Sequence, residues 1–383
     1  MIYSAKDFGA SCRTTAMLAA LLLSGLSACG DGNSGATVKG PAVNNKGLWI
    51  ANGTNVLEYV PSQLAGGTSA AVPHLVNSSG AFGAPQGVTF DAHGNLWVMD
   101  PAGMVNGAAT PALFEFSAAQ LAALAANQKP DPIATITSTA LNFPQQSVFD
   151  SQGNQWVTDH NNNTVLVLTA SQLTRPGTNS TMPAVIISSA DFNGPLGIAF
   201  DGKGNLWVAN NGGVPGANGA TSAVGTTIVE FLAAHLSTPP ATGMLTPDLT
   251  PDVVLSDDGQ LSIQGPWALT FDSTGNLWSS NGNTPFTLVE FSSASLAATG
   301  APVPAVTLSP TMVNGYSSLN APNGICFDNV GDLAAMNSAG AFGIAFFTQA
   351  QLTTGATAPN TFIVGAATTL NAPAGCNFGT LVN

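Results

Sequence analysis

A short segment that recurs along the chain sets the strongest limit on its fold. It consists of an apolar strand, the turn D-x-x-G-[ND] and a second strand; "FDGKGNLWVAN" starts at Phe200, and variants start at Phe90, Phe149, Phe271 and Phe327. The aspartate accepts hydrogen bonds from backbone N–H groups two residues on, and the glycine takes a positive φ, so the segment predicts a tight hairpin. Copies that start roughly 50 to 70 residues apart indicate a repeat architecture.

Each copy is the centre of a unit with four predicted strands. A proline-led strand precedes the aspartate turn and a strand that usually carries tryptophan follows it; a third strand leads into S-x-x-Q-L or a related turn, and a fourth begins after another proline. Four strands without a helical crossover describe the blade of a β-propeller. The full units run over 81–142, 143–192, 193–264, 265–320 and 321–371.

The two ends of the chain complement each other. Residues 372–383 hold an opening strand only, and residues 47–64 hold a second and a third strand only. Joined, they form a sixth blade, and this closure removes the free sheet edges of an open ring. We therefore predict an all-β fold: a six-bladed β-propeller of four-stranded blades over residues 47–383, closed by strands from both termini.

Composition limits the partners that the protein can have. The chain has 383 residues, a formal net charge of −13 and only seven Lys and Arg residues, no two of them adjacent. Nucleic acids and anionic membrane surfaces are bound through clustered basic side chains, so we expect neither as a direct partner.

The N-terminal segment predicts export. Lys6 and Arg13 precede the apolar run "AMLAALLLSGL", which is too short to span a membrane and leads into "LSAC", ending at Cys29. "LSAC" resembles the lipobox of bacterial lipoproteins, which implies that residues 1–28 are a signal peptide and that Cys29 carries lipid. Residues 29–46 then predict a flexible tether, and the protein is expected at the cell envelope, touching the membrane only through its anchor. An ordinary secretory signal, with Cys29 free, is the alternative.

Two cysteines remain in the predicted propeller. Cys326 and Cys376 occupy non-equivalent positions of their repeats. We therefore expect two separate buried thiols rather than a disulfide.

The pattern P-x-G-[IV]-x-F-D-x-x-G-N-L-W-V-x-[DN] resembles the NHL-repeat propellers and is similar to gluconolactonase-like and streptogramin (virginiamycin B) lyase-like proteins. The resemblance covers residues 47–383 and implies a ligand-binding face where first strands start and second strands end. The residues implied there are Asn52, Asp100, Asp159, Asn210, Asn281 and Asn337, with Gln86, Gln145, Leu196, Trp267, Asn323 and Ala374 from the loops before the first strands. A ring of Asp and Asn can hold a cation such as Ca²⁺ or Mg²⁺, or a polar ligand; alternatively, each side chain closes its own turn.

The enzymes among these families imply two more candidates. Gluconolactonase-like enzymes bind a divalent metal through a Glu, an Asn of a "PNG" loop and an Asp of a "PDG" loop, and this chain retains only Asn323, in "APNG". Streptogramin lyases use histidines and a glutamate. Of the four histidines only His160 is expected near the face, so His160 and its neighbour Asp159 are the candidate catalytic residues.

Other features are expected to shape the fold rather than the chemistry. All four glutamates, Glu58, Glu115, Glu230 and Glu290, fall at one position of the third strand. We expect a repeated hydrogen bond from this position to a neighbouring loop, so that Glu115→Gln lowers stability and spares ligand binding. Two inserts, 101–112 and 211–227, are expected as Gly-rich loops on the ligand-binding face, where they either shape or cover a pocket or are simply tolerated surface length.

These features favour a non-catalytic binding or scaffolding module at the cell envelope that recognises a protein, a glycan or a small polar ligand. The alternative is a metal-dependent hydrolase of the lactonase type, or a streptogramin lyase-like enzyme, with a metal held near Asn323 and Asp159.

Overall fold

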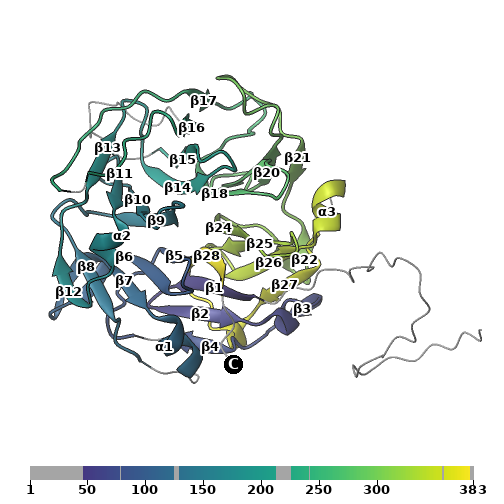
Figure 1. Ribbon diagram of the computed structural model, residues 1–383. Helices are drawn as coiled ribbons and strands as arrows, with labels where there is room; N and C mark the ends of the chain where they lie inside the picture. The colour runs from purple at the N-terminus through teal and green to yellow at the C-terminus, as the bar shows by residue number, and fades with distance from the viewer. Residues whose placement is uncertain are drawn as a thin grey trace, which may run out of the picture. The chain divides into compact units, whose positions relative to one another are not determined.

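The computed structural model describes residues 46–379 apart from 78, 125–128, 213–225, 241 and 356–357. In this part of the chain, six antiparallel sheets surround a central axis as the blades of a propeller (Figure 1). The predicted signal peptide, the predicted lipidation site Cys29 and nearly all of the predicted tether lie outside the described residues. No helix within them is long and apolar enough to cross a membrane.

The six blades match the predicted repeat units, and the strands of each blade follow one another from the central axis outward. Blade 1 contains β28 (Pro373–Gly379), β1 (Gly47–Asn52), β2 (Asn55–Tyr59) and β4 (Leu75–Asn77). Blade 2 contains β5 (Gly87–Phe90), β6 (Leu96–Val105), β7 (Ala108–Phe116) and β8 (Ala134–Thr137), and blade 3 contains β9 (Pro144–Phe149), β10 (Gln155–Asp159), β11 (Thr164–Leu168) and β13 (Val185–Ser188). Blade 4 contains β14 (Pro195–Phe200), β15 (Leu206–Asn210), β16 (Thr227–Phe231) and β17 (Val253–Leu255). Blade 5 contains β18 (Pro266–Phe271), β19 (Leu277–Asn281), β20 (Leu288–Phe291) and β21 (Val306–Leu308), and blade 6 contains β24 (Pro322–Phe327), β25 (Leu333–Asn337), β26 (Gly343–Phe347) and β27 (Thr361–Val364).

Short helices follow the third strand in four blades, as the S-x-x-Q-L segments predict. These are η1 (Pro61–Gln63), α1 (Ala118–Ala123), α2 (Ala170–Leu173) and α3 (Gln349–Thr354). A small hairpin, β22 (Met312–Val313) with β23 (Tyr316–Ser317), lies between blades 5 and 6, and η3 (Ala366–Thr368) precedes β28.

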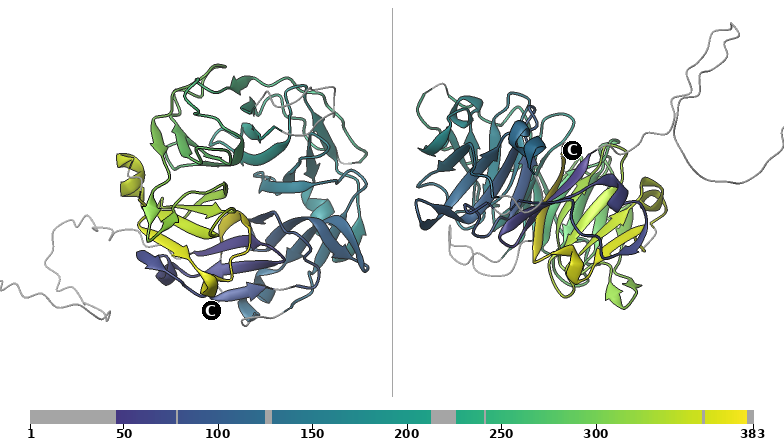
Figure 2. Two further views of the ribbon diagram at one scale, coloured as in Figure 1. Left: turned by 180° about the vertical axis from the view of Figure 1, so that it is seen from behind. Right: turned by 90° about the horizontal axis from the view of Figure 1, so that it is seen from below.

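The ring closes as predicted. The N-terminal strand β1 lies between β2 and the C-terminal strand β28, with Leu48 opposite Phe378 and Ile50 opposite Cys376. Both views in Figure 2 show the purple N-terminal strands beside the yellow C-terminal strand. Blade 1 is therefore held together by main-chain hydrogen bonds between the two ends of the chain.

Aromatic pairs join successive blades. In each pair, the tryptophan of one blade meets, edge to face, the phenylalanine that opens the turn of the next. The pairs are Trp49–Phe90, Trp97–Phe149, Trp156–Phe200, Trp207–Phe271 and Trp278–Phe327, with ring centroids 5.5–6.3 Å apart. Such a pair contributes about 0.5–1.5 kcal/mol beyond the burial of its area. The F-D and W positions of the repeat are thus the two halves of one contact between blades.

In some blades the outermost strand also pairs with a segment of the next blade, which the sequence did not predict. β12 (Gly177–Ser180) leaves blade 3 to pair in parallel with β8 of blade 2, and β3 (Gly67–Ser69) pairs in the same way with β27 of blade 6. Isolated parallel bridges join Leu245 to Val185 and Asp248 to Ser188 of blade 3, and Gly300 to Leu255 of blade 4. In each case the segment after a third strand covers the outer edge of the preceding blade.

The insert 101–112 is a strand hairpin rather than the Gly-rich loop that we expected. β6 and β7 continue through it with a bulge between Asp100 and Gly103. Asn106 and Gly107 have φ values of 51° and 81°, which is the backbone of a tight two-residue hairpin turn. Most of the second insert, 211–227, lies outside the described residues.

Cys326 and Cys376 form a disulfide with their Cα atoms 6.0 Å apart, so the expectation of separate thiols was wrong. They lie on β24 and β28, the innermost strands of neighbouring blades. Neighbouring blades face each other with opposite faces of their sheets, and side chains alternate between faces along a strand. Two cysteines on equivalent strands therefore meet across the interface only if their repeat positions differ by an odd number. Cys326 and Cys376 differ by one position, so their non-equivalent positions, from which we expected separate thiols, are what the disulfide requires.

We predict that this disulfide stabilises the closed ring. It links residues separated by 50 positions, a loop whose closure is worth about 4 kcal/mol in chain-entropy terms. A Cys326→Ser/Cys376→Ser variant should melt at a lower temperature than the wild type by circular dichroism. Reductant should lower the Tm of the wild type to that of the variant and leave the variant unchanged; a wild-type Tm insensitive to reductant and equal to that of the variant would contradict the prediction.

Candidate functional site

The six Asp and Asn side chains expected on the ligand-binding face are fully buried. Asn52, Asp100, Asp159, Asn210, Asn281 and Asn337 all have 0% relative exposure. In blades 2 to 6 the side chain accepts a hydrogen bond from the backbone N–H 17 residues earlier, at 2.7–3.1 Å. In blade 1, Asn52 accepts one from Asn371 at 2.7 Å. Of the two uses considered, the structure shows these side chains closing the loop that leads into their own blade.

Whether this position is Asp or Asn matches the backbone groups around it: Asp where they are all N–H donors, and Asn where a carbonyl also needs a donor. Asp100 accepts hydrogen bonds from three backbone N–H groups, those of Gly83, Ala84 and Ala102. By contrast, Asn281 accepts one from Gln264 and donates its Nδ2 to the carbonyl of Ser262. Burial raises the pKa of Asp100 and of Asp159, against the opposing effect of these N–H groups. With all six buried and bonded inside their own blades, the ring offers no carboxylate to solvent.

The remaining residues expected on this face differ in exposure. Gln145, Leu196, Asn323 and Ala374 are buried, while Gln86 and Trp267 are partly exposed. His160 is partly exposed, with its Nδ1 3.1 Å from Asn161 Oδ1. Asn323 and Asp159 belong to blades 6 and 3, which are on opposite sides of the ring (Figure 1). Catalysis by His160 and Asp159 stays a prediction.

The residues at Asn323 do not fit a divalent metal. Its Oδ1 is buried and has no hydrogen-bond partner. Ca²⁺ and Mg²⁺ take about six or more oxygen ligands, several of them carboxylates or water. Within the described ranges, no group of three or more His, Cys, Asp and Glu side chains is placed to hold a metal ion. One unpartnered amide oxygen is not such a ligand set.

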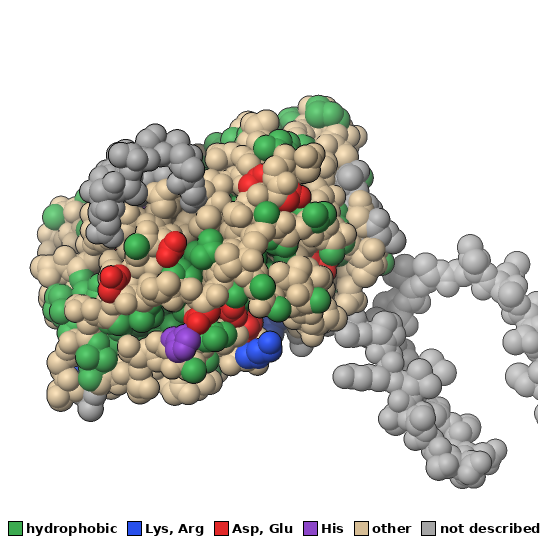
Figure 3. All heavy atoms as spheres, turned by 90° about the horizontal axis from the view of Figure 1, so that it is seen from above, with side chains coloured by type: hydrophobic (Ala, Val, Ile, Leu, Met, Phe, Trp, Pro, Cys, Tyr) green, Lys and Arg blue, Asp and Glu red, His purple; other side chains and the backbone are tan. Residues whose placement is uncertain are grey.

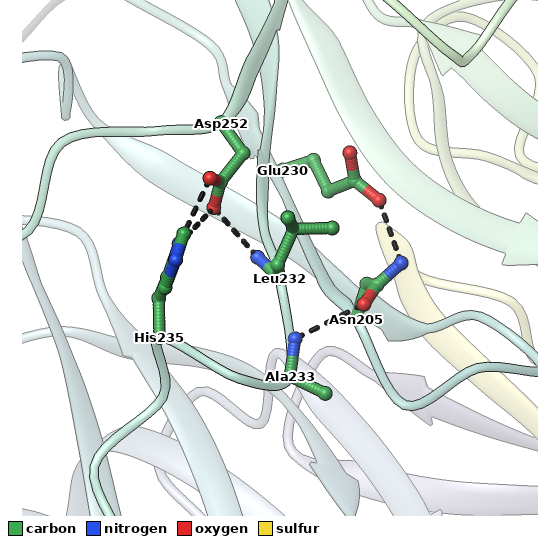
Figure 4. A network of polar contacts seen from close by, with 6 residues as sticks. All are labelled: Asn205, Glu230, Leu232, Ala233, His235 and Asp252. Atoms are coloured by element: carbon green, nitrogen blue, oxygen red, sulfur yellow. Dashed lines mark hydrogen bonds and ion pairs between the residues drawn. The ribbon is translucent and has the colours of Figure 1, made fainter.

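The four glutamates make the local contacts that their repeat position predicts. Asn95, the last residue of the D-x-x-G-N turn, donates from Nδ2 to Glu115 at 3.0 Å, and its Oδ1 accepts a hydrogen bond from the N–H of Ala118. Asn205 makes the same bonds to Glu230 and Ala233, as Figure 4 shows. In blades 2 to 5 the asparagine thus ties the hairpin turn to the segment that follows the third strand. In blade 1, Glu58 lies 3.0 Å from Nδ1 of His74 instead.

A cavity lies on the opposite face of the ring, where the D-x-x-G-N turns are. It has a volume of about 720 Å³ and lies between the turns of blades 3 and 4, with residues 236–239 as an outer wall. Such a volume is typical of sites for small ligands. We call it the blade 3–4 pocket and define it by Phe149, Asp150, Gln152, Trp156, Phe200, Asp201, Lys203, Leu236, Ser237 and Thr238. No sequence pattern indicated this site.

The equivalent clefts between other blades are smaller. The cleft between blades 4 and 5 has about 490 Å³ and that between blades 5 and 6 about 360 Å³. The central channel, lined by all six innermost strands, encloses about 280 Å³. The blade 3–4 pocket therefore differs from its counterparts by its outer wall rather than by the turns that they share.

The outer wall follows a repeat position that differs between the blades. In four blades a glutamine accepts a hydrogen bond from the N–H three residues earlier and donates to a carbonyl just before the fourth strand: Gln63, Gln120, Gln172 and Gln351. In blade 4 this position is His235, whose Nδ1 lies 2.8 Å from Asp252 (Figure 4). Pro239 and Pro240 follow, and proline disfavours continuation of a helix. The chain instead runs outward and bridges to blade 3 at Leu245.

Comparisons with known proteins support the fold and nothing finer. No family model and no curated protein matches the chain. A chain in the crystal structure of a nidogen/laminin complex superposes with a TM-score of 0.53 at 12% identity, over 87% of this chain and 98% of that one. A protein of unknown function from Bacteroides caccae gives 0.54 at 8% identity, over 88% and 100%.

A structure of streptogramin B lyase aligns less well, with a TM-score of 0.39 at 15% identity, over 70% of this chain and 66% of that one. Likeness at this level carries no argument about activity. The propeller part of the resemblance expected from the sequence is confirmed, and the identities assign the chain to no enzyme family.

We predict that Glu115 makes stability fall as pH rises. Burial, and then the charge of Asp91, raise the pKa of Glu115 from 4.5 to about 7. The folded state therefore holds this proton more tightly than the unfolded state, and stability is lost between about pH 4.5 and pH 7. Glu115→Gln keeps an oxygen for Asn95 and removes the charge. Tm profiles should show the variant equal to the wild type near pH 4.5 and more stable at pH 8, which reverses the direction that the sequence led us to expect.

The matched control is Asp131→Ala, at an exposed position of the same blade, which should leave the pH profile of the wild type unchanged. A Glu115→Gln variant that is less stable than the wild type at pH 8 would show that ionised Glu115 is favourable in the folded protein.

Proposed function

We propose that the protein is a non-catalytic ligand-binding module of the bacterial cell envelope, held there by lipid on Cys29, and that its ligand occupies the blade 3–4 pocket. The observation that carries the proposal is this cavity of about 720 Å³, which combines an aromatic floor with a polar rim. Sites for small ligands commonly have this composition.

Two features favour binding over catalysis. The six Asp and Asn side chains that catalysis would need on the opposite face are buried and bonded to their own loops. Both acids at the pocket are committed to their turns: Asp150 accepts hydrogen bonds from Gln152 and Asn154, and Asp201 from Lys203 and Asn205. Neither is placed as a free general base.

The alternative function is that of a metal-dependent lactonase-like hydrolase or a streptogramin lyase-like enzyme. Its basis is the sequence "APNG" around Asn323, the one loop that resembles the gluconolactonase pattern. Enzyme activity would have to arise on the face opposite the blade 3–4 pocket, so variants on the two faces separate the two functions.

The binding proposal is tested by blocking the pocket. Gly202 lines the pocket, and a Cβ there meets nothing within 4 Å, so Gly202→Trp places a large side chain at the edge of the pocket without strain. Thermal unfolding of the mature chain with panels of oligosaccharides, peptides and small polar metabolites should reveal a stabilising ligand, worth about 2.7 kcal/mol at 100 times its Kd. Gly202→Trp should abolish the shift, and Ser273→Trp, at the same turn position in blade 5, should keep it.

Two results would overturn the binding proposal. One is that no panel gives a shift sensitive to Gly202→Trp. The other is metal-dependent lactone hydrolysis or streptogramin cleavage that is lost in Asn323→Ala and retained in Gly202→Trp, which would establish the enzyme.

The lipid anchor is tested separately. When the full chain is expressed in a bacterium that processes lipoproteins, the wild type should partition with membranes and Cys29→Ser should be released as a soluble protein. Wild-type protein recovered free of membranes would favour the ordinary secretory signal.

A further inference from the structure

We infer that the blade 3–4 pocket takes an uncharged oligosaccharide; this inference rests on the proposed function and names its ligand class. Four properties of the pocket support it: the floor, the rim, the charge and the walls. The pocket lies on the side of the ring away from the face that the sequence pattern implied.

The floor of the pocket supplies apolar ring surface. Phe149 and Phe200 are both partly exposed, and Trp156, which is 3% exposed, packs edge to face on Phe200 beneath them with ring centroids 5.5 Å apart. Leu236 adds an aliphatic side chain from the outer wall. Because the neighbouring blades hold these rings in place, little ordering is needed on binding. The C–H face of a pyranose ring packs on such a surface.

The rim supplies hydrogen-bonding groups, most of them uncharged. Gln152 and Lys203 stand at the third position of the two turns and are exposed, and Ser237 and Thr238 line the opposite wall. Amide, hydroxyl and ammonium groups donate to sugar hydroxyls, and the amide and hydroxyl oxygens also accept from them. An apolar floor with this rim matches a ligand that has apolar ring faces and hydroxyl edges.

The charged groups that line the pocket argue against both anionic and cationic saccharides. The pocket is lined by two carboxylates, Asp150 and Asp201, and one ammonium, Lys203, in a chain of formal net charge −13, so polyanions are disfavoured. A cationic ligand would need a free carboxylate. All four carboxylate oxygens already accept hydrogen bonds, including one from the indole Nε1 of Trp156 to Asp150 at 2.9 Å.

Figure 3 shows that charged side chains are sparse on the side of the ring seen from above, where hydrophobic and other uncharged groups make up most of the surface. An uncharged ligand meets no electrostatic penalty there, and its affinity depends little on ionic strength.

The walls of the pocket argue against a peptide. Peptides are commonly bound by adding a strand to a sheet edge, by placing a helix in an apolar groove or by charged clusters. In the blade 3–4 pocket the walls are two hairpin turns and residues 236–239, none of which is a strand. The outer edge of blade 3 is already bridged by Leu245 and Asp248.

The test uses the mature chain on an array of neutral, acidic and basic oligosaccharides and a peptide library, followed by titration calorimetry of the best ligand. We expect a neutral oligosaccharide whose Kd changes less than about twofold between 50 mM and 500 mM NaCl. Gly202→Trp should weaken it by roughly tenfold or more, and Ser273→Trp should leave it unchanged. Lys203→Gln should weaken it by less than about tenfold, because it replaces one donor without removing a charge partner.

The outcomes separate this inference from the proposed function. An anionic saccharide whose affinity falls steeply with salt and with Lys203→Gln, or a peptide lost in Gly202→Trp, would overturn the oligosaccharide and leave the binding module standing. A neutral saccharide bound equally by Gly202→Trp would place the site elsewhere and overturn the inference. If no ligand of any class binds, both the inference and the proposed function are overturned. Unchanged far-UV circular dichroism melting of the variants confirms that each remains folded.

Discussion

Burial of both faces of every blade is the constraint on which the rest of this structure depends. The second strands β1, β10, β15, β19 and β25 are buried at every residue, so each sheet needs a neighbour on both sides. An open row of blades would leave two apolar faces in water, and only a closed ring avoids this. Closure in turn requires the termini to share blade 1, where β1 pairs with β28 and the disulfide of Cys376 joins that blade to blade 6.

The polar residues that recur with each blade serve the same end. The turn aspartate binds its own backbone, the turn asparagine reaches the end of the third strand, and the Asp or Asn three residues after the tryptophan position closes the loop ahead. Each satisfies backbone groups that the ring would otherwise bury without partners, and a buried unpaired group costs about 1–3 kcal/mol. A repeated polar residue in this chain is therefore a poor guide to its ligand site. The departures from the repeat are more informative: His235, which stands in place of glutamine, and the prolines after it lie at or beside one cavity.

The sequence pattern and the structure place the ligand site on different faces of the ring. The pattern predicted the face where the second strands end, because a ring of Asp and Asn there suggested a cation or a polar ligand. Whether a side chain faces solvent depends on the path of the loop in front of it, and in this propeller those loops fold over the ring and use its oxygens. The blade 3–4 pocket results from a long connection in blade 4 that packs against blade 3. Residues 236–239 are distant in sequence from the turn at Asp150, and nothing in either segment alone indicates that they line one cavity.

By itself, the sequence determined the number of blades, their boundaries, the hairpin in each and the closure by both termini, because apolar alternation and turn chemistry are local and repeat with a period that can be read directly. It also placed the glutamates in local hydrogen bonds. Only the tertiary structure decided what meets across blades: the pairing of Cys326 with Cys376, the Trp–Phe contacts, the outer parallel bridges and the pocket. These depend on which faces of two sheets oppose each other and on where a long connection packs, and both are set by the closed ring as a whole.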